Sequence, residues 1–488
     1  MFSFVNPIAK LSAAISVVLL LLLSSCATYY QRIQAYHTSL ATGNFLKADE
    51  QLDGIGLLQK SRNKLLYLLE KGKTAHLLQQ YDSSNTYFNE ADQIIESSRT
   101  TAKDLLVTGL LNPMFQDYHP EDFEKFMVHY YKALNYLFLG NTEDALVEAR
   151  RITLASNQQE DKWSGKKNRY NDDAFSMMLQ GMIYEKGNDM NNAFIAYRNA
   201  AEVYLKNDSK YYGTSMPLQL KKDVLRTAYL MGFSSEQSRY EKIFDRVYTN
   251  EPNATGGEAI VFWESGMAPV KEQQTIQFNI VANSGQFFFR DNAGLYNVPF
   301  DNSVVGYNQN LRLSDIQMFA IALPKYREQP MRFWGATLSS PAGTFSFEKA
   351  QDISTLAVQT LKQRFGKELA TALSRMAIKK LTEIAATPKE DKKKKYRNEE
   401  ERKKAERKRD QQELLALGLK IFNRATEKAD TRNWQSLPNS IFYSRIPLQP
   451  GVNNISISLR NSGTVSDNRT IVLEGNGGLQ FATVYTMR

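Results

Sequence analysis

The sequence is poor in cysteine and histidine. It contains one cysteine, Cys26, and four histidines among 488 residues. A single thiol excludes an intramolecular disulfide framework and a zinc site built from several cysteines. The histidines do not occur at metal-binding spacings such as HExxH; they are His37, His76, His119 and His129. We therefore expect no metal site and no cofactor.

The motifs of common catalytic nucleophiles are also missing. The sequence has no G-x-S-x-G, and its S-x-x-K and S-D-N stretches are not accompanied by the K-T-G that completes that motif set. The glycine-rich run Gly475 to Gly478 is not followed by Lys-Ser/Thr, so it indicates a hairpin turn rather than a phosphate-binding loop. These absences favour a protein that is not an enzyme.

The basic charge is unevenly distributed. The formal net charge is +9, and residues 389–413 contain twelve Lys/Arg and eight Asp/Glu, so 12 − 8 = +4 of it lies in this run. Nucleic acid attracts basic runs, but the glutamates here alternate with the basic residues. We expect no nucleic-acid binding and interpret residues 389–413 as a charged, exposed helix or loop.

The N-terminus has the three parts of an export signal. Lys10 supplies a positive charge, Leu11 to Leu23 is free of charge, and Ser24 and Ser25 are small. Thirteen residues form a helix of about 20 Å, which is shorter than a hydrocarbon core of about 30 Å. Residues 1–25 are therefore predicted to be a signal peptide rather than a membrane span.

The stretch Leu23-Ser24-Ser25-Cys26 resembles the bacterial lipobox. The resemblance implies a lipoprotein that is cut before Cys26, whose thiol and new amino terminus carry acyl chains such as palmitate. Two or three acyl chains hold a protein stably on a bilayer. Ala27 stands where aspartate would favour retention in the inner membrane. The resemblance thus implies an outer-membrane lipoprotein that faces the periplasm.

Residues 26–250 are predicted to be a helical repeat domain. Apolar residues recur there at spacings of three and four. Small and aromatic residues follow the tetratricopeptide pattern in one segment, and related spacings occur near Gly72 and Ala133; the residues are Gly181, Tyr184, Ala193, Tyr197 and Ala200. Because the intervals between copies are irregular, we expect a degenerate tetratricopeptide-like α-solenoid.

Residues 257–488 are predicted to form an α+β domain, which makes the whole chain an α+β multidomain protein. Short β-type runs bounded by turn residues begin at Glu258 and return after Ser440. Between them, Ser346 to Ala386 carries one apolar stripe at helical spacing, with a break expected at Gly366. We expect this long helix to cover a mixed or antiparallel sheet.

Two groups of residues are candidate binding sites. Glu264 and Lys271 flank a Gly/Pro-containing loop within residues 262–273, and loops held by rigid strands often carry sites. The other interpretation of this loop is a tight connection whose charges are solvated or paired. Stacked helix pairs usually offer a concave surface to a protein partner. Its candidate aromatic residues are Tyr130, Tyr131, Tyr136, Tyr184 and Tyr197.

Several stretches resemble an uncharacterised family of Gram-negative lipoproteins with tetratricopeptide-like repeats. They include "EAIVFWESGMAPVKEQ", "FAIALPKYR" and "ATEKADTRNWQSLPNSIFYSRIPLQPG". Members of this family are often encoded near lipoproteins that activate penicillin-binding proteins. The resemblance implies work on the cell envelope and supplies no catalytic residues.

We therefore predict a lipid-anchored periplasmic scaffold or adaptor. It would bind protein partners in cell-envelope biogenesis, in the assembly of peptidoglycan or of the outer membrane. The alternative is an envelope hydrolase or a polysaccharide-binding protein that uses residues 262–273. The sequence leaves the oligomeric state open.

Overall fold

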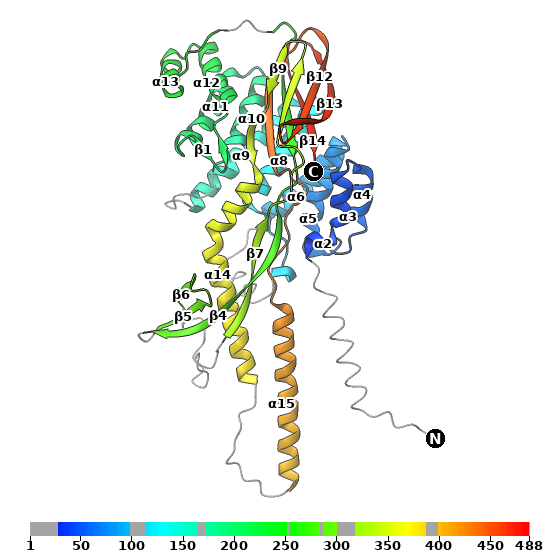
Figure 1. The fold of residues 1–488 in the computed structure, drawn as a ribbon, viewed down its shortest axis with the longest axis vertical. Helices are drawn as coiled ribbons and strands as arrows, with labels where there is room; N and C mark the ends of the chain where they lie inside the picture. The colour runs from blue at the N-terminus through cyan, green and yellow to red at the C-terminus, as the bar shows by residue number, and fades with distance from the viewer. Residues whose placement is uncertain are drawn as a thin grey trace, which may run out of the picture.

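The computed structural model describes residues 28–97, 113–163, 172–250, 254–283, 286–299, 318–386 and 399–487. The predicted signal peptide and Cys26 lie outside these residues. The described chain combines many helices with several sheets (Figure 1), so the prediction of a mixed helix and sheet fold is confirmed. Within the described ranges, no helix is long and apolar enough to cross a membrane.

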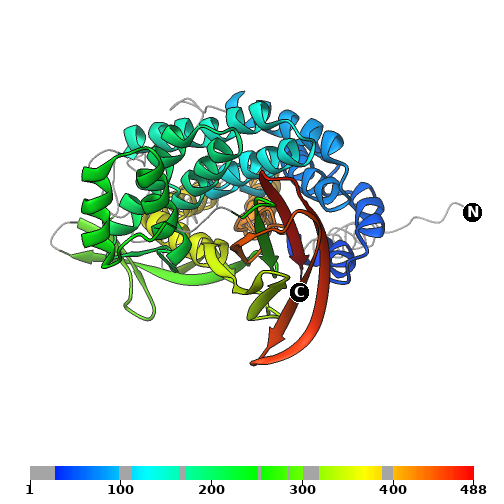
Figure 2. The ribbon, with the colours of Figure 1, turned by 90° about the horizontal axis from the view of Figure 1, so that it is seen from above.

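Helices fill the first half of the chain and form a curved row (Figure 2). Neighbouring helices pack as pairs, namely α5 with α6, α8 with α9, α10 with α11 and α12 with α13. The helices are α2 (Tyr29–Arg32), α3 (Gln34–Ala41), α4 (Phe45–Asp53), α5 (Lys64–Leu77), α6 (Tyr81–Ser97), α8 (Asp122–Phe138), α9 (Thr142–Trp163), α10 (Ala174–Lys186), α11 (Met190–Leu205), α12 (Leu218–Leu230) and α13 (Ser234–Phe244), with 3₁₀ turns η1 (Ser61–Asn63) and η2 (Pro113–Phe115).

Glycine allows two of these pairs to approach closely. A Cβ atom on Gly72 of α5 would lie 2.7 Å from the ring of Phe88 in α6. A Cβ atom on Gly181 of α10 would lie 2.6 Å from the ring of Tyr197 in α11. Since no real Cβ contact is this short, each ring occupies the space that any larger residue would need. The same packing device therefore recurs in two helix pairs.

The described residues of the second half of the chain form three four-stranded sheets. Their strand orders are β10-β11-β3-β14, β13-β12-β8-β9 and β6-β5-β4-β7. All pairings are antiparallel except that of β14 with β3. The strands are β3 (Glu258–Ser265), β4 (Val270–Asn283), β5 (Gln286–Asp291), β6 (Asn297–Pro299), β7 (Met318–Arg327), β8 (Gly335–Ser340), β9 (Gly343–Ser346), β10 (Glu348–Asp352), β11 (Ser440–Pro447), β12 (Gly451–Asn461), β13 (Thr464–Gly475) and β14 (Leu479–Thr486), besides the small hairpin β1 (Lys210–Tyr211) and β2 (Thr214–Ser215).

The first sheet lies inside the curve of the helices (Figure 2). One hydrophobic core runs from Tyr29 in α2 to Met487 after β14 and includes Phe262 of β3. The rings of Tyr130 in α8 and Phe262 meet edge to face at 6.2 Å between centroids. The two halves of the chain therefore share a core, and the C-terminal half fills the concave side of the helical row.

The other face of the first sheet packs on the second sheet. Buried side chains from both sheets form a separate core, which includes Trp263 of β3, Leu338 of β8 and Ile457 of β12. Along β12, Ile455, Ile457 and Leu459 are buried and alternate with more exposed residues, as expected for a strand with one covered face. These two sheets form a sandwich.

A long helix, α14 (Ile353–Ala386), covers the third sheet. Leu369, Leu373 and Met376 of the helix pack on Phe278 and Phe289 of the sheet. The expected start at Ser346 is wrong, because β9 ends at this residue and residues 348–352 pair with β11 as β10. The expected break at Gly366 is also wrong, because the helix continues through it.

Helix α15 (Glu399–Thr426) runs beside α14 and extends away from the rest of the molecule (Figure 1). The described part of the predicted charged run, Glu399 to Glu413, lies on this helix, and nearly all of it is exposed. Ion pairs three or four residues apart connect its charges, including Arg402 with Glu406 and Arg409 with Glu413. Such pairs stabilise an exposed helix by a few tenths of a kcal/mol each, about 0.2–0.5.

Candidate functional site

The predicted binding loop lies in the interior of the protein. It connects β3 to β4, and every residue from Ala259 to Lys271 is buried. Gly266 adopts a φ of +66°, and a Cβ atom there would lie 2.9 Å from Met331 Cγ. The amide of Ala268 donates a 2.7 Å hydrogen bond to the carbonyl of Leu437. The loop is thus a tight connection against other parts of the chain.

Glu264, at the end of β3, is paired with a lysine of the helical row. Lys73 Nζ lies 2.5 Å from Glu264 Oε2, and both side chains are fully buried. The hydroxyls of Tyr131 and Tyr130 donate to the same carboxylate at 3.0 and 3.2 Å. Burial lowers the pKa of Lys73, and the Glu264 charge opposes that effect. This carboxylate therefore has its partners inside the protein.

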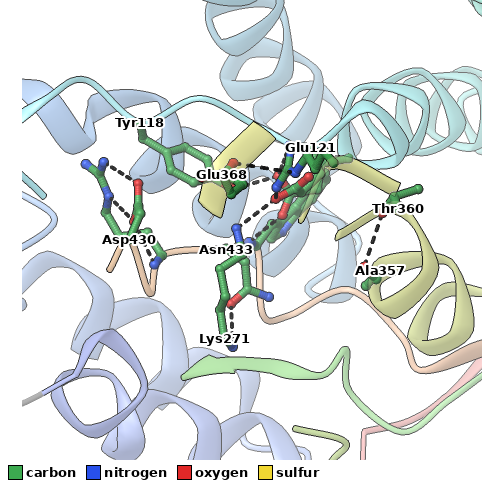
Figure 3. Close-up of polar contacts among 12 residues, drawn as sticks. Tyr118, Glu121, Lys271, Ala357, Thr360, Glu368, Asp430 and Asn433 are labelled. Carbon is green, nitrogen blue, oxygen red and sulfur yellow. Dashed lines mark hydrogen bonds and ion pairs between the residues drawn. The ribbon is translucent and has the colours of Figure 1, made fainter. Parts of the chain in front are cut away.

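Lys271, at the start of β4, is paired with the helical row in a second place (Figure 3). Its Nζ lies 2.7 Å from Glu121 Oε1, and Arg364 of α14 donates to the same oxygen. Burial alone would raise the pKa of Glu121, but Arg364 and Lys271 together lower it to about 2. Glu121 precedes α8 and forms its capping box with Glu124. One carboxylate thus joins α8, β4 and α14.

Glu124 is the most unusual acid in this region. It accepts hydrogen bonds from the Tyr118 hydroxyl at 2.6 Å, from the Glu121 amide at 2.7 Å and from the Trp434 amide at 2.8 Å. Burial and the neighbouring Glu121 charge raise the pKa of Glu124 to about 7, although these hydrogen bonds favour the ionised form. Its role is to bind backbone of the segment that follows α15.

That segment, residues 427–439, crosses the concave side of the helical row. Trp434 is fully buried with its ring 5.7 Å from Phe88 and 5.9 Å from Tyr131, measured between centroids. The amide of Gln435 donates to Glu70 Oε1 at 3.0 Å. The hydroxyls of Tyr29 and Tyr36 each donate to Glu70 at 3.2 Å. Buried carboxylates of the helices therefore hold this extended segment by its backbone.

Arg432 fixes the same segment to two turns of the helical half. It donates to Asn63 Oδ1 at 2.7 Å and to the carbonyls of Gln116 and Pro113 at 3.0 Å each. It also pairs with Asp430 at 2.7 Å. Both carbonyls belong to the region between α6 and α8, so this arginine joins three parts of the chain.

A larger ion network joins β11 to the helical row further along. Arg445 Nη1 donates to Glu185 Oε2 at 3.0 Å and to Asp223 Oδ1 at 3.2 Å, and the guanidinium also pairs with Glu258 of β3. Arg226 pairs with Glu185 at 2.8 Å. The Arg445 and Arg226 charges lower the pKa of Glu185 against the effect of burial. Strand β11 is thereby bonded to α10 and α12.

The tyrosines expected on a partner surface lie mostly inside the protein. Tyr130, Tyr131, Tyr184 and Tyr197 are buried, while Tyr136 is half-buried. Tyr197 packs on Gly181 and donates to Glu185 at 3.0 Å. The expectation of an exposed aromatic surface is therefore wrong for the four buried tyrosines, because β3 and the neighbouring helices cover them.

The chemistry available at these charged groups is limited. In the ranges that the structure describes, no group of three His, Cys, Asp or Glu side chains could hold a metal ion. Two surface cavities, of about 610 and 370 Å³, are lined by other residues. The larger one lies beside α5 and α6, and the smaller one lies on β4 and β5. Neither cavity is lined by Glu264, Lys271 or the five tyrosines.

Comparisons with known proteins add little to this geometry. No family model matches the chain, and no curated protein matches it. Among solved structures, the apo form of RapI aligns with 48% of this chain and 58% of its own, at 12% identity and a TM-score of 0.31. The alignment thus spans less than two thirds of RapI, and its similarity is too weak to assign a fold or a function.

Proposed function

We propose that this protein is a lipid-anchored scaffold or adaptor without enzymatic activity. It would be held on the outer membrane, face the periplasm and bind protein partners in the biogenesis of the cell envelope. We further propose that its helix pairs are degenerate tetratricopeptide-like repeats. The recurrence of glycine against an aromatic ring, at Gly72 and Gly181, supports that assignment.

The observation that carries the proposal is the short separation in sequence between Cys26, the predicted lipid site, and the first residue that the structure describes. Cys26 precedes Thr28, the first described residue, by only two positions. The amide of Tyr29 donates to Thr431 Oγ1, so α2 is bonded to the segment that follows α15. A lipid on Cys26 would therefore hold the folded body directly at the membrane surface.

The charged groups of the interior favour a structural role over catalysis. Glu264 and Lys271 each have a buried partner of opposite charge on the helical row. The alternative function, an envelope hydrolase or a polysaccharide-binding protein, would require these two residues to be accessible. The exposed part of helix α15 is a more accessible surface for a protein partner.

Mass spectrometry of the N-terminal peptide tests the anchor. Full-length protein purified from envelopes should begin at Cys26 and carry a diacylglyceryl group on sulfur and an acyl group on the amine. Protein that keeps residues 1–25, or that has a free thiol, would exclude lipid anchoring.

Site-specific photo-crosslinking in intact envelopes tests the scaffold role. A crosslinker at the exposed residue Lys404 of α15 should capture one defined protein. The same group at Arg246, which is exposed after α13, serves as the control. Turnover of a cell-wall glycan by the purified protein, with no protein captured at Lys404, would favour the enzymatic alternative.

A further inference from the structure

An exposed tryptophan lies at one end of the sheet sandwich. The side chain of Trp334 is 66% exposed, whereas its neighbour Phe333 is buried in the sandwich core. The amide of Trp334 donates to the carbonyl of Arg460 at 3.0 Å. Arg460 also pairs in register with Val465, which is 45% exposed. We call Arg332, Trp334, Arg460 and Val465 the Trp334 patch.

The patch is cationic as well as apolar. Arg332 and Arg460 are both exposed. Among the described residues, no acidic side chain forms an ion pair with either arginine, nor with Lys325 on the strand leading to the patch. Arg327, by contrast, shares its charge with Glu272 at 2.5 Å. An exposed indole flanked by arginines that form no ion pair within the described ranges suits an interface that is apolar and negatively charged.

The patch follows a strand that reaches α2, the first helix that the structure describes. The guanidinium of Arg327, the last residue of β7, lies 5.5 Å from the ring centroid of Tyr30 in α2. Trp334 is seven residues further on, so its Cα lies at most about 25 Å from that of Arg327. The Cα of Cys26 lies at most about 7 Å from that of Thr28. A bilayer holding a lipid at Cys26 therefore comes close to this side of the protein.

We propose that the Trp334 patch and Lys325 form the face that rests on the bilayer. Tryptophan is enriched where membranes meet water, since its ring is apolar and its N–H is polar. Lysine and arginine near a bilayer are attracted to anionic headgroups. The partner is thus a membrane containing anionic lipid, and the inference rests on the proposed anchor at Cys26.

Fluorescence quenching by brominated lipid tests the contact. Acylated full-length protein is placed in phosphatidylglycerol vesicles with brominated acyl chains, and the emission of W334F is subtracted to isolate Trp334. The other three tryptophans, Trp163, Trp263 and Trp434, are present in both proteins, so their emission cancels in the subtraction. The Trp334 component should be largely lost in these vesicles and preserved in vesicles without bromine. An unquenched Trp334 on acylated, vesicle-bound protein would overturn the inference and leave the anchor intact.

A charge-reversal pair tests the role of the cations. R332E/R460E should lose most of the Trp334 quenching in phosphatidylglycerol vesicles. The control K206E/R246E makes the same change of charge at exposed residues after α11 and α13 and should keep it. Equal quenching in R332E/R460E and the control would overturn the inference that these arginines attract the patch to anionic headgroups.

The two remaining outcomes are also distinct. If a photo-crosslinker at position 334 captures a protein in envelopes while Trp334 stays unquenched by lipid, the patch binds a protein and the inference fails. If mass spectrometry finds Cys26 unmodified, the proposed anchor fails, and the membrane face fails with it.

Discussion

Lys73 and Glu264 are 191 positions apart in the sequence, yet their charged atoms lie 2.5 Å apart in the interior. The lysine belongs to the helical row and the glutamate to β3, an inner strand of the first sheet. Their contact is one of several buried polar links between these halves. The contact bonds β3 to α5 of the helical row.

Replacing Glu264 by glutamine should strongly destabilise the protein, because Lys73 would remain buried without a counter-charge. Removal of one partner of a buried pair typically costs about 3–5 kcal/mol. The double variant K73M/E264Q should recover part of this loss. Urea unfolding monitored by circular dichroism measures the free energies of unfolding. A double variant no more stable than E264Q would contradict the explanation that the unpaired buried lysine causes the loss.

Replacing Gly181 by alanine should destabilise the pair α10 and α11, because the new Cβ would overlap the Tyr197 ring. Overpacking of this kind costs about 1–3 kcal/mol. Gly366 of α14 is a matched control, since a Cβ there meets nothing within 4 Å. G366A should be neutral or stabilise by up to about 1 kcal/mol through helix propensity. In thermal unfolding, G181A should therefore melt at a lower temperature than the wild type, and G366A should not. Similar melting temperatures of the two variants would contradict the packing argument.

Glu124 should make stability fall as pH rises. Its pKa is raised to about 7 in the folded protein from the ordinary 4.5, so between these values the folded state holds a proton that the unfolded state has lost. The contribution is therefore present below pH 4.5, falls through the window from 4.5 to 7, and amounts to roughly 3 kcal/mol.

The variant E124Q isolates this effect. Burial lowers the pKa of His37 and His76 to about 3, and this makes stability rise with pH over part of the same window. The comparison must therefore be a difference between wild type and E124Q, measured by urea unfolding from pH 4.5 to 7. Stability should fall less, or rise more, with pH in E124Q. Parallel profiles would show that Glu124 is ionised in both states.

Truncation of Arg445 should lower the free energy of unfolding far more than truncation of Arg409. R445A would remove one of the two arginines shared by buried Glu185 and Asp223 and leave them with Arg226, with an expected loss of about 3–5 kcal/mol. Arg409 pairs with Glu413 on the exposed helix α15, and R409A should change stability by less than about 1 kcal/mol. The denaturant midpoints of R445A and R409A measure both changes in stability. A large effect of R409A would indicate that α15 packs on something else.

Local patterns in the sequence predicted much of the fold. Small residues at Gly72 and Gly181 indicated close helix pairs, and the alternation of Ile455, Ile457 and Leu459 with serine and asparagine indicated a strand with one buried face. These patterns are local because a helix or strand shows its buried face through its own periodicity. The start of α14 was misjudged because Ser346 to Asp352 has no strong pattern of either kind.

The sequence singled out Glu264 and Lys271 but could not predict their pairing, because the partners are distant in the sequence. Glu70 and Lys73 occur in the stretch "LLYLLEKGKTAHLL", where charges are expected to face solvent. Nothing near them indicates Gln435 or Glu264 as partners. The tyrosines were assigned to a free concave surface because a helical repeat alone has one. In this protein β3 and residues 427–439 occupy that side.

The position of β14 has a consequence for biosynthesis. This strand, residues 479–486, pairs with β3, and its Tyr485 hydroxyl lies 2.6 Å from His76 in α5, 409 positions earlier. Contacts over such separations form late, because long loops must close first. A chain that ends before Leu479 would leave β3 as an unpaired edge inside the helical row. The shared core, which includes Leu479 and Met487, therefore cannot be completed until nearly the whole chain has been synthesised.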